Sequence, residues 1–564
     1  MFFFKKLFVN CEKLLRLNLR KRMAALTSIS GVLGFSRAKH LLNRTTFGYT
    51  FAQLQQVSNL TIDAALNILF TDVATPTPPT DLKTGATWLN PAPVTDTNSE
   101  EDTLITYYKA WHLDLMKTAG LSVKERIVYF LHTHLPVQQS IVRTSTDIYY
   151  QNALYRYYAF GSYKTLFKKV IVDNAMLQYI DNHLNEKNSP NENFAREMFE
   201  LYTIGKGVQV GADDYTNYTE TDVQQAARVL TGFKADSAFT NLDSETLLPT
   251  AKLITDELNH TYLHDPGVKT FSSRFNNKTI APIELLDGYA TIAATYDELE
   301  QLVTMIFDMD ETARFMCRKL YRFFVYYKIT PEIETDIIIP LAQTFKDNNF
   351  EIKSVLDVLL RSQHFFDEDT TPTSDNHIGA IIKSPVELIL GAFTQFEVSK
   401  PSSLTDFYNI FSNSILHWLD QQGMNFYEPI DVAGYPAYTQ LPTFNRYWIT
   451  PNTLPYRYKF IEDLINNSGT SIDKPDFALF VKNTFSGADN ANSLVTNLTE
   501  FLFSHPVPVS RIDYYTTTFL GILSTSDWSV AWSNYIASGS DAVVKPLLEK
   551  LIITLLQSPE YQLL

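Results

Sequence analysis

Apolar residues recur at spacings of three and four along most of the chain. The spacing is clear at Leu302, Met305, Ile306 and Met309. It is the period of a helix that buries one face. The sequence has no alternating run long enough to build a sheet, no glycine-rich phosphate loop and no internal repeat. The pattern predicts an all-α protein, a multi-helix body with long irregular loops.

Three segments interrupt this helical pattern. Residues 73–101 and 234–279 are rich in proline and small polar residues, and we predict both as loops because proline fixes φ and lacks an amide donor. Residues 423–457 are rich in aromatic residues and proline. Helical spacing continues on both sides of each segment, so residues 23–564 are predicted as a single large helical domain.

Residues 1–22 are predicted as a basic amphipathic extension. They contain seven Lys or Arg residues and one acidic residue, Glu12. Such a segment is suited to weak contact with an anionic membrane surface. It lacks the apolar run and cleavage site of a secretory signal, so a cytoplasmic location is the default expectation. The alternative is a dispensable extension, with Met23 as the natural start.

The composition excludes several classes of protein. There are 47 basic and 62 acidic residues, and the net charge of -15 argues against nucleic acid as a partner. Cys11 and Cys317 are the only cysteines, which excludes a disulfide framework and a thiolate zinc cluster. No apolar stretch reaches the roughly 20 residues of a transmembrane helix.

Two histidines lie at the end of a helix predicted over residues 122–135. Ser122 begins a capping box, and Pro136 follows the helix end. His134 falls within the apolar arc, while His132 falls on the opposite side. Joint ligation of one metal ion would therefore require the helix to unwind near Pro136. The alternative for each is a hydrogen-bonded core histidine.

Carboxylates crowd one side of a helix predicted over residues 189–205, with Ser189 as its N-cap. Its polar side contains Arg196, Glu197 and Glu200 but no lysine. Neighbouring carboxylates repel one another unless a cation or a shared proton intervenes. This arrangement is typical of hard-metal and acid/base sites. The alternative is a solvent-facing side with ion pairs at i,i+4.

A third helix and a polar turn complete the candidate chemistry. The helix is predicted from Thr219 to near Gly232, and Thr219 forms a capping box with Asp222. Within the second loop, His264 and Asp265 precede a Pro-Gly turn. They are either a turn that only presents polar residues or a second metal or acid/base element.

Six motifs occur in a recognisable order. They are AKHLLNRTTFG (38–48), ERIVYFLHTHL (125–135), NENFAREMFELYTIG (191–205), YTETDVQQAARVLTGF (218–233), HDPGVKTF (264–271) and EPIDVAGYPAY (428–438). Together they resemble the bacterial family known as domain of unknown function 1800. The resemblance implies a largely helical unit, often exported and often encoded beside a sulfatase-like protein, but no reaction. The family typically reads Trp-His-Asn-His-Phe at 131–135; here both histidines remain.

The first functional hypothesis is an enzyme with one divalent metal ion. Imidazole and carboxylate ligands without thiolates suit iron, manganese or zinc. Such a site would make the protein a metal-dependent hydrolase or oxidase. The predicted catalytic residues are Arg196, Glu197 and Glu200. The predicted metal ligands are His132, His134, Glu200, His264 and Asp265.

The second hypothesis is a non-catalytic binding or scaffold subunit. Its motif is GYPAYTQLPTFNRYW, which contains Tyr435, Tyr438, Phe444, Tyr447 and Trp448. Such a segment is suited to stacking against a carbohydrate or to gripping a partner, here the sulfatase-like protein implied by the resemblance. The alternative is that these rings fasten a long loop onto the helical body.

Overall fold

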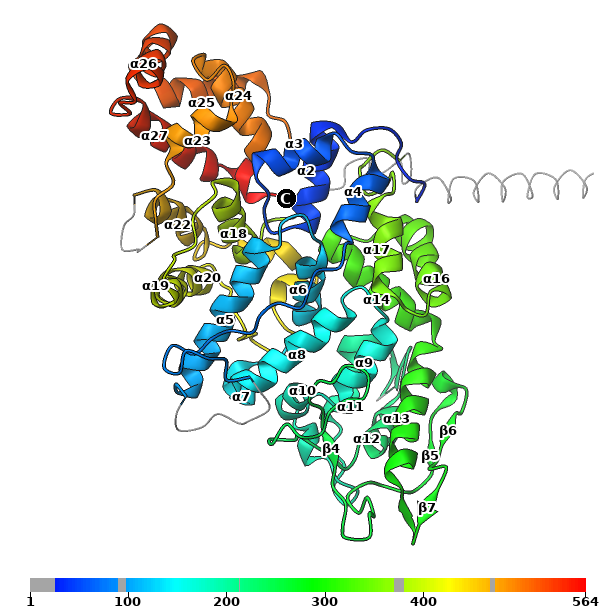
Figure 1. The fold of residues 1–564 in the computed structure, drawn as a ribbon. Coiled ribbons are helices and arrows are strands. Elements are labelled where there is room, and N and C mark those ends of the chain that lie inside the picture. Colours follow the sequence, from blue (N-terminus) through cyan, green and yellow to red (C-terminus); the bar gives the residue numbers. More distant parts are fainter. Residues whose placement is uncertain (1–25, 90–97, 213, 370–379, 467–471) are drawn as a thin grey trace, which may run out of the picture.

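Helices dominate the structure, as the sequence predicts (Figure 1). The computed structural model describes residues 26–89, 98–212, 214–369, 380–466 and 472–564. The predicted extension 1–22 lies outside the described residues. Within the described parts of both predicted loops, the backbone is mostly irregular, and the second loop also forms very short strands and one 3-10 helix of three residues.

Apart from the irregular stretch before Glu101, the first part of the described chain is mainly helical up to Thr203. Its elements are α2 (Gly34–Thr45), α3 (Phe51–Ser58), α4 (Ile62–Leu69), α5 (Glu101–Thr118), α6 (Lys124–His134), α7 (Gln139–Val142), α8 (Ser145–Tyr158), α9 (Tyr163–Ile171), α10 (Asn174–Tyr179), η1 (Asn182–Leu184), α11 (Asn193–Glu197) and η2 (Met198–Thr203). The last of these is a π-helix that continues α11 directly.

The described residues of the middle part form four small antiparallel sheets. The pairs are β1 (Gln209–Gly211) with β2 (Asp214–Tyr215), β3 (Phe233–Lys234) with β4 (Lys252–Leu253), β5 (Lys269–Thr270) with β6 (Thr279–Ile280), and β7 (Leu285–Leu286) with β8 (Tyr289–Ala290). Helices α12 (Glu220–Val229) and η3 (Ser273–Phe275) lie between them in sequence. These sheets were not predicted, because strands of two or three residues are too short to show a period-two pattern.

Helices continue from Ile292 to the C-terminus. They are α13 (Ile292–Phe307), α14 (Asp310–Phe324), α15 (Pro331–Ile333), η4 (Glu334–Ile338), α16 (Ile339–Asp347), α17 (Ile352–Leu360), α18 (Pro385–Gln395), α19 (Leu404–Ile410), η5 (Phe411–Ile415), α20 (Leu416–Gln421), α21 (Pro436–Thr439), η6 (Phe444–Trp448), α22 (Leu454–Asn466), α23 (Phe477–Thr484), α24 (Ala491–Leu502), α25 (Val509–Leu520), α26 (Thr525–Ser538), α27 (Val544–Leu556) and η7 (Pro559–Gln562).

The molecule is elongated, with α6 near its middle (Figure 1). Helices α23 to α27 lie at one end and the small sheets at the other. Buried apolar side chains from Ile29 to Tyr561 form one contiguous cluster. The single domain over residues 23–564 nevertheless stays a prediction. No helix in the described ranges is long and apolar enough to cross a membrane.

Helix α6 is buried on all sides, which differs from the predicted two-faced helix. Every residue from Lys124 to His134 is buried. Its polar side is satisfied inside the protein, where the Glu125 carboxylate accepts two hydrogen bonds from the Arg156 guanidinium. Ser122 accepts a hydrogen bond from the Lys124 amide at 3.2 Å, but Glu125 does not complete the predicted capping box.

The predicted start of the helix at Ser189 is wrong. Helix α11 begins at Asn193, and Ser189 forms an isolated β-bridge with Glu186. The side chain of Asn191 accepts a hydrogen bond from the Asn193 amide at 3.0 Å. An asparagine turn therefore leads into the helix in place of the predicted serine cap. The predicted Thr219–Asp222 capping box of α12 is confirmed.

Candidate functional site

His132 lies in an aromatic cage. Its ring centroid is 4.2 Å from that of Tyr427 and 5.6 Å from that of Phe426. Neither ring nitrogen has a hydrogen-bond partner, and burial lowers the pKa of His132 to about 3. His112 is a neighbour at 6.4 Å between ring centroids, but its Nδ1 is engaged by the Tyr427 hydroxyl at 2.9 Å. His132 is therefore a neutral core residue.

His134 lies in different surroundings. Its Nε2 is 3.0 Å from the Tyr163 hydroxyl, which itself donates to the Tyr202 carbonyl at 2.9 Å. Because the tyrosine proton is committed to that carbonyl, His134 donates through Nε2 and keeps a lone pair on Nδ1. That nitrogen is buried without a partner. The ring stacks on Phe130 and lines a pocket described below.

The predicted catalytic residues of α11 and η2 lie partly in solvent. Arg196 pairs with Glu220 at 2.5 Å and Glu192 at 3.2 Å. Glu200 accepts from the Tyr218 hydroxyl at 3.1 Å and pairs with Lys206 at 3.3 Å. The arrangement contains the i,i+4 pair expected of a solvent-facing side, and Lys206 supplies the lysine that the helix itself lacks.

Glu197 is the unusual acid of this group, and its replacement by glutamine should stabilise the protein at high pH. Burial, and next the charge of Glu200, raise its pKa from 4.5 to about 7. The folded protein therefore holds this proton more tightly than the unfolded chain does. The associated stabilisation is complete below about pH 4.5 and is lost as the pH rises through about 7.

Glutamine cannot ionise, so Glu197→Gln should melt above wild type at pH 8 and close to wild type at pH 4. Thermal melting followed by circular dichroism at both pH values measures the difference. Glu192→Gln is the control, because Glu192 belongs to the same segment and its carboxylate is partly exposed. An equal change for both variants at both pH values would contradict the prediction.

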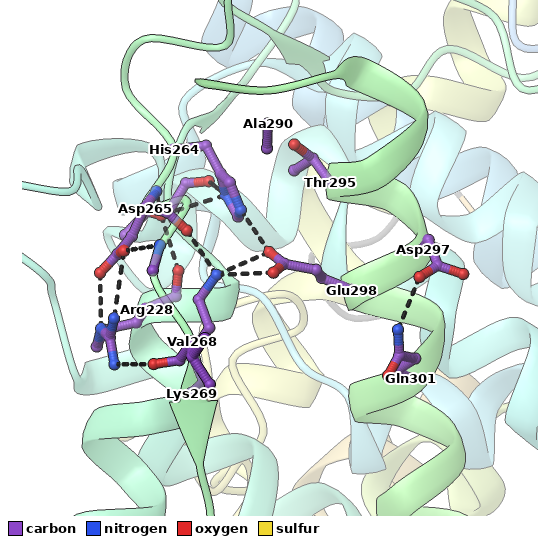
Figure 2. A network of polar contacts seen from close by, with 12 residues as sticks. Arg228, His264, Asp265, Val268, Lys269, Ala290, Thr295, Asp297, Glu298 and Gln301 are labelled. Carbon is purple, nitrogen blue, oxygen red and sulfur yellow. Dashed lines mark hydrogen bonds and ion pairs between the residues drawn. The ribbon is translucent and has the colours of Figure 1, made fainter. Parts of the chain in front are cut away.

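His264 and Asp265 belong to a closed network of charges (Figure 2). His264 Nε2 is 2.6 Å from a carboxylate oxygen of Glu298, and Nδ1 is 2.9 Å from the Thr231 carbonyl. Lys269 donates to both oxygens of Glu298 at 2.8 and 2.9 Å. Asp265 pairs with Arg228 at 2.6 Å. Both nitrogens of His264 face oxygen acceptors, so neither offers a metal a free lone pair.

The predicted metal ligands thus have separate environments. Within the residues that the structure describes, no group of three or more His, Cys, Asp or Glu side chains is arranged to hold a metal ion. The site of iron, manganese or zinc stays a prediction from the sequence. The contacts favour different chemistry, centred on the pocket beside His134.

This pocket lies where α6, α14, the start of α18 and the segment 423–457 meet. Its cavity offers about 40 Å³ of space to the centres of water-sized molecules, within about 600 Å³ of empty space that includes open solvent. Its aromatic wall consists of Phe130, Phe323, Tyr327, Tyr438, Phe444 and Trp448. Its basic groups are Arg126, His134, Lys319 and Arg322. Glu387 is the one carboxylate among its lining residues in the described ranges.

Close backbone packing holds the aromatic segment against α6. Gly434 has φ +102°, and a Cβ atom added there would lie 3.0 Å from the Thr133 carbonyl oxygen. Glycine is therefore needed for the approach. Tyr435, Phe444 and Trp448 are buried, while Tyr447 remains 39% exposed. Most of these rings fasten the segment to the body, and some of the same rings also line the pocket.

Glu387 is surrounded by more positive charge than it can neutralise. Its carboxylate accepts a hydrogen bond from Arg126 Nη1. It also acts electrostatically on Arg44, Lys383 and Arg457, all buried. Burial lowers the pKa of Lys383 to about 7 and that of Arg44 to about 9. One carboxylate thus faces four basic side chains.

Two further cations add to the excess from the α14 side. Lys319 Nζ lies 5.3 Å from the centroid of the Phe315 ring, and no carboxylate pairs with it among the described residues. Arg322 donates to the Tyr327 carbonyl at 3.3 Å and lies over the Phe444 ring. Burial, and next the charge of Arg322, lower the pKa of Lys319 to about 8.

Comparison with known proteins identifies the chain. A family model described as "Protein of unknown function (DUF1800)" matches residues 40–563. No curated protein and no solved structure gives a match. The match covers nearly the whole chain and confirms the resemblance of the six motifs. The chain therefore belongs to the DUF1800 family.

Proposed function

We propose that the protein binds a small organic anion in the pocket between α6, α14 and the aromatic segment. The observation that carries this proposal is the excess of positive charge: Arg126, Lys319 and Arg322 line the pocket with Glu387 as the only carboxylate among its described lining residues. Cations held partly or fully out of water with too little counter-charge are costly, and a bound anion offsets that cost.

Unused hydrogen-bond donors support the same proposal. Arg126 is 1% exposed, and its Nε has no hydrogen-bond partner although Nη1 is bound to Glu387. The guanidinium fork suits a carboxylate, phosphate or sulfate group, which accepts charge-assisted hydrogen bonds. Lys319 also lines the pocket and supplies a further donor when its amine is protonated. The anionic group of the ligand would accept from these side chains.

The aromatic wall favours binding of an organic anion over binding of an inorganic ion such as phosphate. Tyr438, Phe444 and Trp448 offer apolar ring surface beside the cations. Such rings stack well against a sugar or an aromatic ring. These contacts support the binding hypothesis. The ligand would be a carbohydrate or an aromatic compound that also carries an anionic group. The metal-dependent hydrolase or oxidase and the sulfatase-like partner remain alternatives without a comparable supporting contact.

Isothermal titration with phenyl phosphate and benzoate tests the proposal. Wild type should bind at least one of them and should not bind uncharged benzyl alcohol measurably. Lys319→Met should weaken binding roughly 10-fold to 100-fold, because a hydrogen bond to a charged group contributes about 1.5–3 kcal/mol. Raised salt should weaken binding further.

Lys353→Met is the matched control for this titration. Lys353 Nζ also lies over phenylalanine rings, 5.7 Å from Phe70 and 6.0 Å from Phe160, but Lys353 does not line the pocket. This variant should bind like wild type. Absence of binding by both anions, or equal losses in the two lysine variants, would refute the proposed function.

A further inference from the structure

We propose that the Lys319 amine is a nucleophile that condenses with the carbonyl group of an aldehyde or ketone whose anionic group is held by Arg126 and Arg322. This inference rests on the proposed function, because it names the chemical class of the ligand of the same pocket. It also adds a covalent step, the formation of an imine, that anion binding alone does not require.

Lys319 differs from the lysines that have structural partners. Lys168 pairs with Glu300 at 2.6 Å, and Lys269 donates to Glu298 in the closed network. In the described part of the chain, Lys319 has neither a carboxylate nor a hydrogen-bond acceptor, only the Phe315 ring at 5.3 Å. Its side chain lines the pocket and keeps partial exposure. The amine is thus uncommitted, and its side chain borders the pocket.

The surroundings of Lys319 also favour its neutral form. Burial and the neighbouring Arg322 lower its pKa to about 8, so a substantial fraction of the amine lacks its extra proton near that pH. A lysine becomes nucleophilic when it is desolvated or placed beside another cation, and both conditions hold here. The geometry of the pocket and this charge environment therefore point to the same group.

The positions of the two arginines explain why the carbonyl compound should be anionic. Arg322 follows Lys319 by three residues on α14, so the two side chains lie on the same side of that helix. Arg126 reaches the pocket from α6. An anion held by these guanidiniums would keep its carbonyl carbon near the amine, and such positioning raises the effective concentration of the reacting groups.

The condensation is balanced without a further reagent. The neutral amine attacks the carbonyl carbon, a C–N bond forms as the C=O π bond breaks, and a proton passes from nitrogen to oxygen to give a carbinolamine. The C–O bond then breaks, the oxygen leaves as water with the second proton from nitrogen, and the C=N bond of the imine remains. Nothing is oxidised or reduced, and water is the only leaving group.

Trapping with borohydride tests the inference on the full-length protein. The protein is incubated with pyridoxal 5′-phosphate at about one equivalent, the imine is reduced to a secondary amine, and the modified lysine is located by peptide mass spectrometry. We expect Lys319 to be the main modified residue. Lys319→Met should lose most of the label, whereas Lys353→Met should keep it.

Two comparisons separate this inference from the proposed function. Uncharged pyridoxal should label Lys319 at least roughly 10-fold less, since it lacks the phosphate that the arginines would bind. Phenyl phosphate, which has no carbonyl group, should protect Lys319. Equal labelling by pyridoxal would overturn the requirement for an anion.

If phenyl phosphate binds by calorimetry but the label is spread over surface lysines, the nucleophile is refuted and the anion pocket stands. If phenyl phosphate does not bind and Lys319 is not labelled, both the proposed function and this inference fail.

Discussion

Replacing Glu387 by glutamine should lower the free energy of unfolding by roughly 3–5 kcal/mol, the usual cost of removing one partner from a buried ion pair. Glu387 is the carboxylate that accepts from Arg126 and faces Arg44, Lys383 and Arg457. Glutamine keeps the shape of the side chain but leaves these cations without a counter-charge. Urea unfolding followed by circular dichroism measures the change.

Glu257→Gln is the control for this experiment, because Glu257 is exposed and its variant should change stability by less than about 0.5 kcal/mol. Added sulfate should raise the stability of Glu387→Gln more than that of wild type, since a bound anion would replace part of the missing charge. A loss below about 1 kcal/mol would show that the carboxylate is not needed to balance the cations.

The parts of the fold that were predicted correctly rest on local signals. The Thr219–Asp222 capping box is made by residues three apart, and it appears in α12 as predicted. Helix α6 ends at His134, as expected from Pro136. At Ser189 two local signals compete, and the Asn191 side chain takes the role that the serine pattern suggested. When two neighbouring residues can each cap the start of a helix, the sequence alone does not show which of them does so.

The candidate pocket depends on contacts that no local pattern contains. Arg126 and Glu387 are 261 residues apart in sequence. Nothing in the spacing of α6 or α18 indicates that they pair. A signal was nevertheless present, because α14 places Lys319 and Arg322 one helical turn apart. The distinctive property of Lys319 is that no carboxylate pairs with it among the described residues, which the sequence cannot show.

The predicted metal site also depends on contacts that the sequence does not show. His132, His134 and His264 were grouped because histidine beside carboxylates is typical of metal ligands. In the structure their neighbours are aromatic rings, tyrosine hydroxyls and the Glu298–Lys269 pair. The aromatic segment was predicted more usefully, since Tyr438, Phe444 and Trp448 both pack on the body and line the pocket.

Glu298→Ala should be the most destabilising change in the network of Figure 2, with a loss of roughly 3–5 kcal/mol. The side chains of His264, Lys269 and Glu298 are all 0% exposed. Removing the carboxylate leaves the Lys269 ammonium without its anionic partner and His264 Nε2 without its acceptor, and no solvent can replace them. Urea unfolding and the melting temperature both report the loss.

Glu300→Ala on the same helix is the matched control. Glu300 pairs with Lys168 at 2.6 Å, but their side chains are 46% and 37% exposed, so the expected loss is at most about 1 kcal/mol. The double variant Glu298→Leu with Lys269→Leu should be more stable than Glu298→Ala, because it removes the unpaired charge together with its partner. If the free energy of unfolding falls as much in the double variant as in Glu298→Ala, or more, the loss of stability comes from packing around α13 and not from the unpaired ammonium. If the double variant instead recovers stability, the network contributes little net stability and serves to fix how β5 packs against α13.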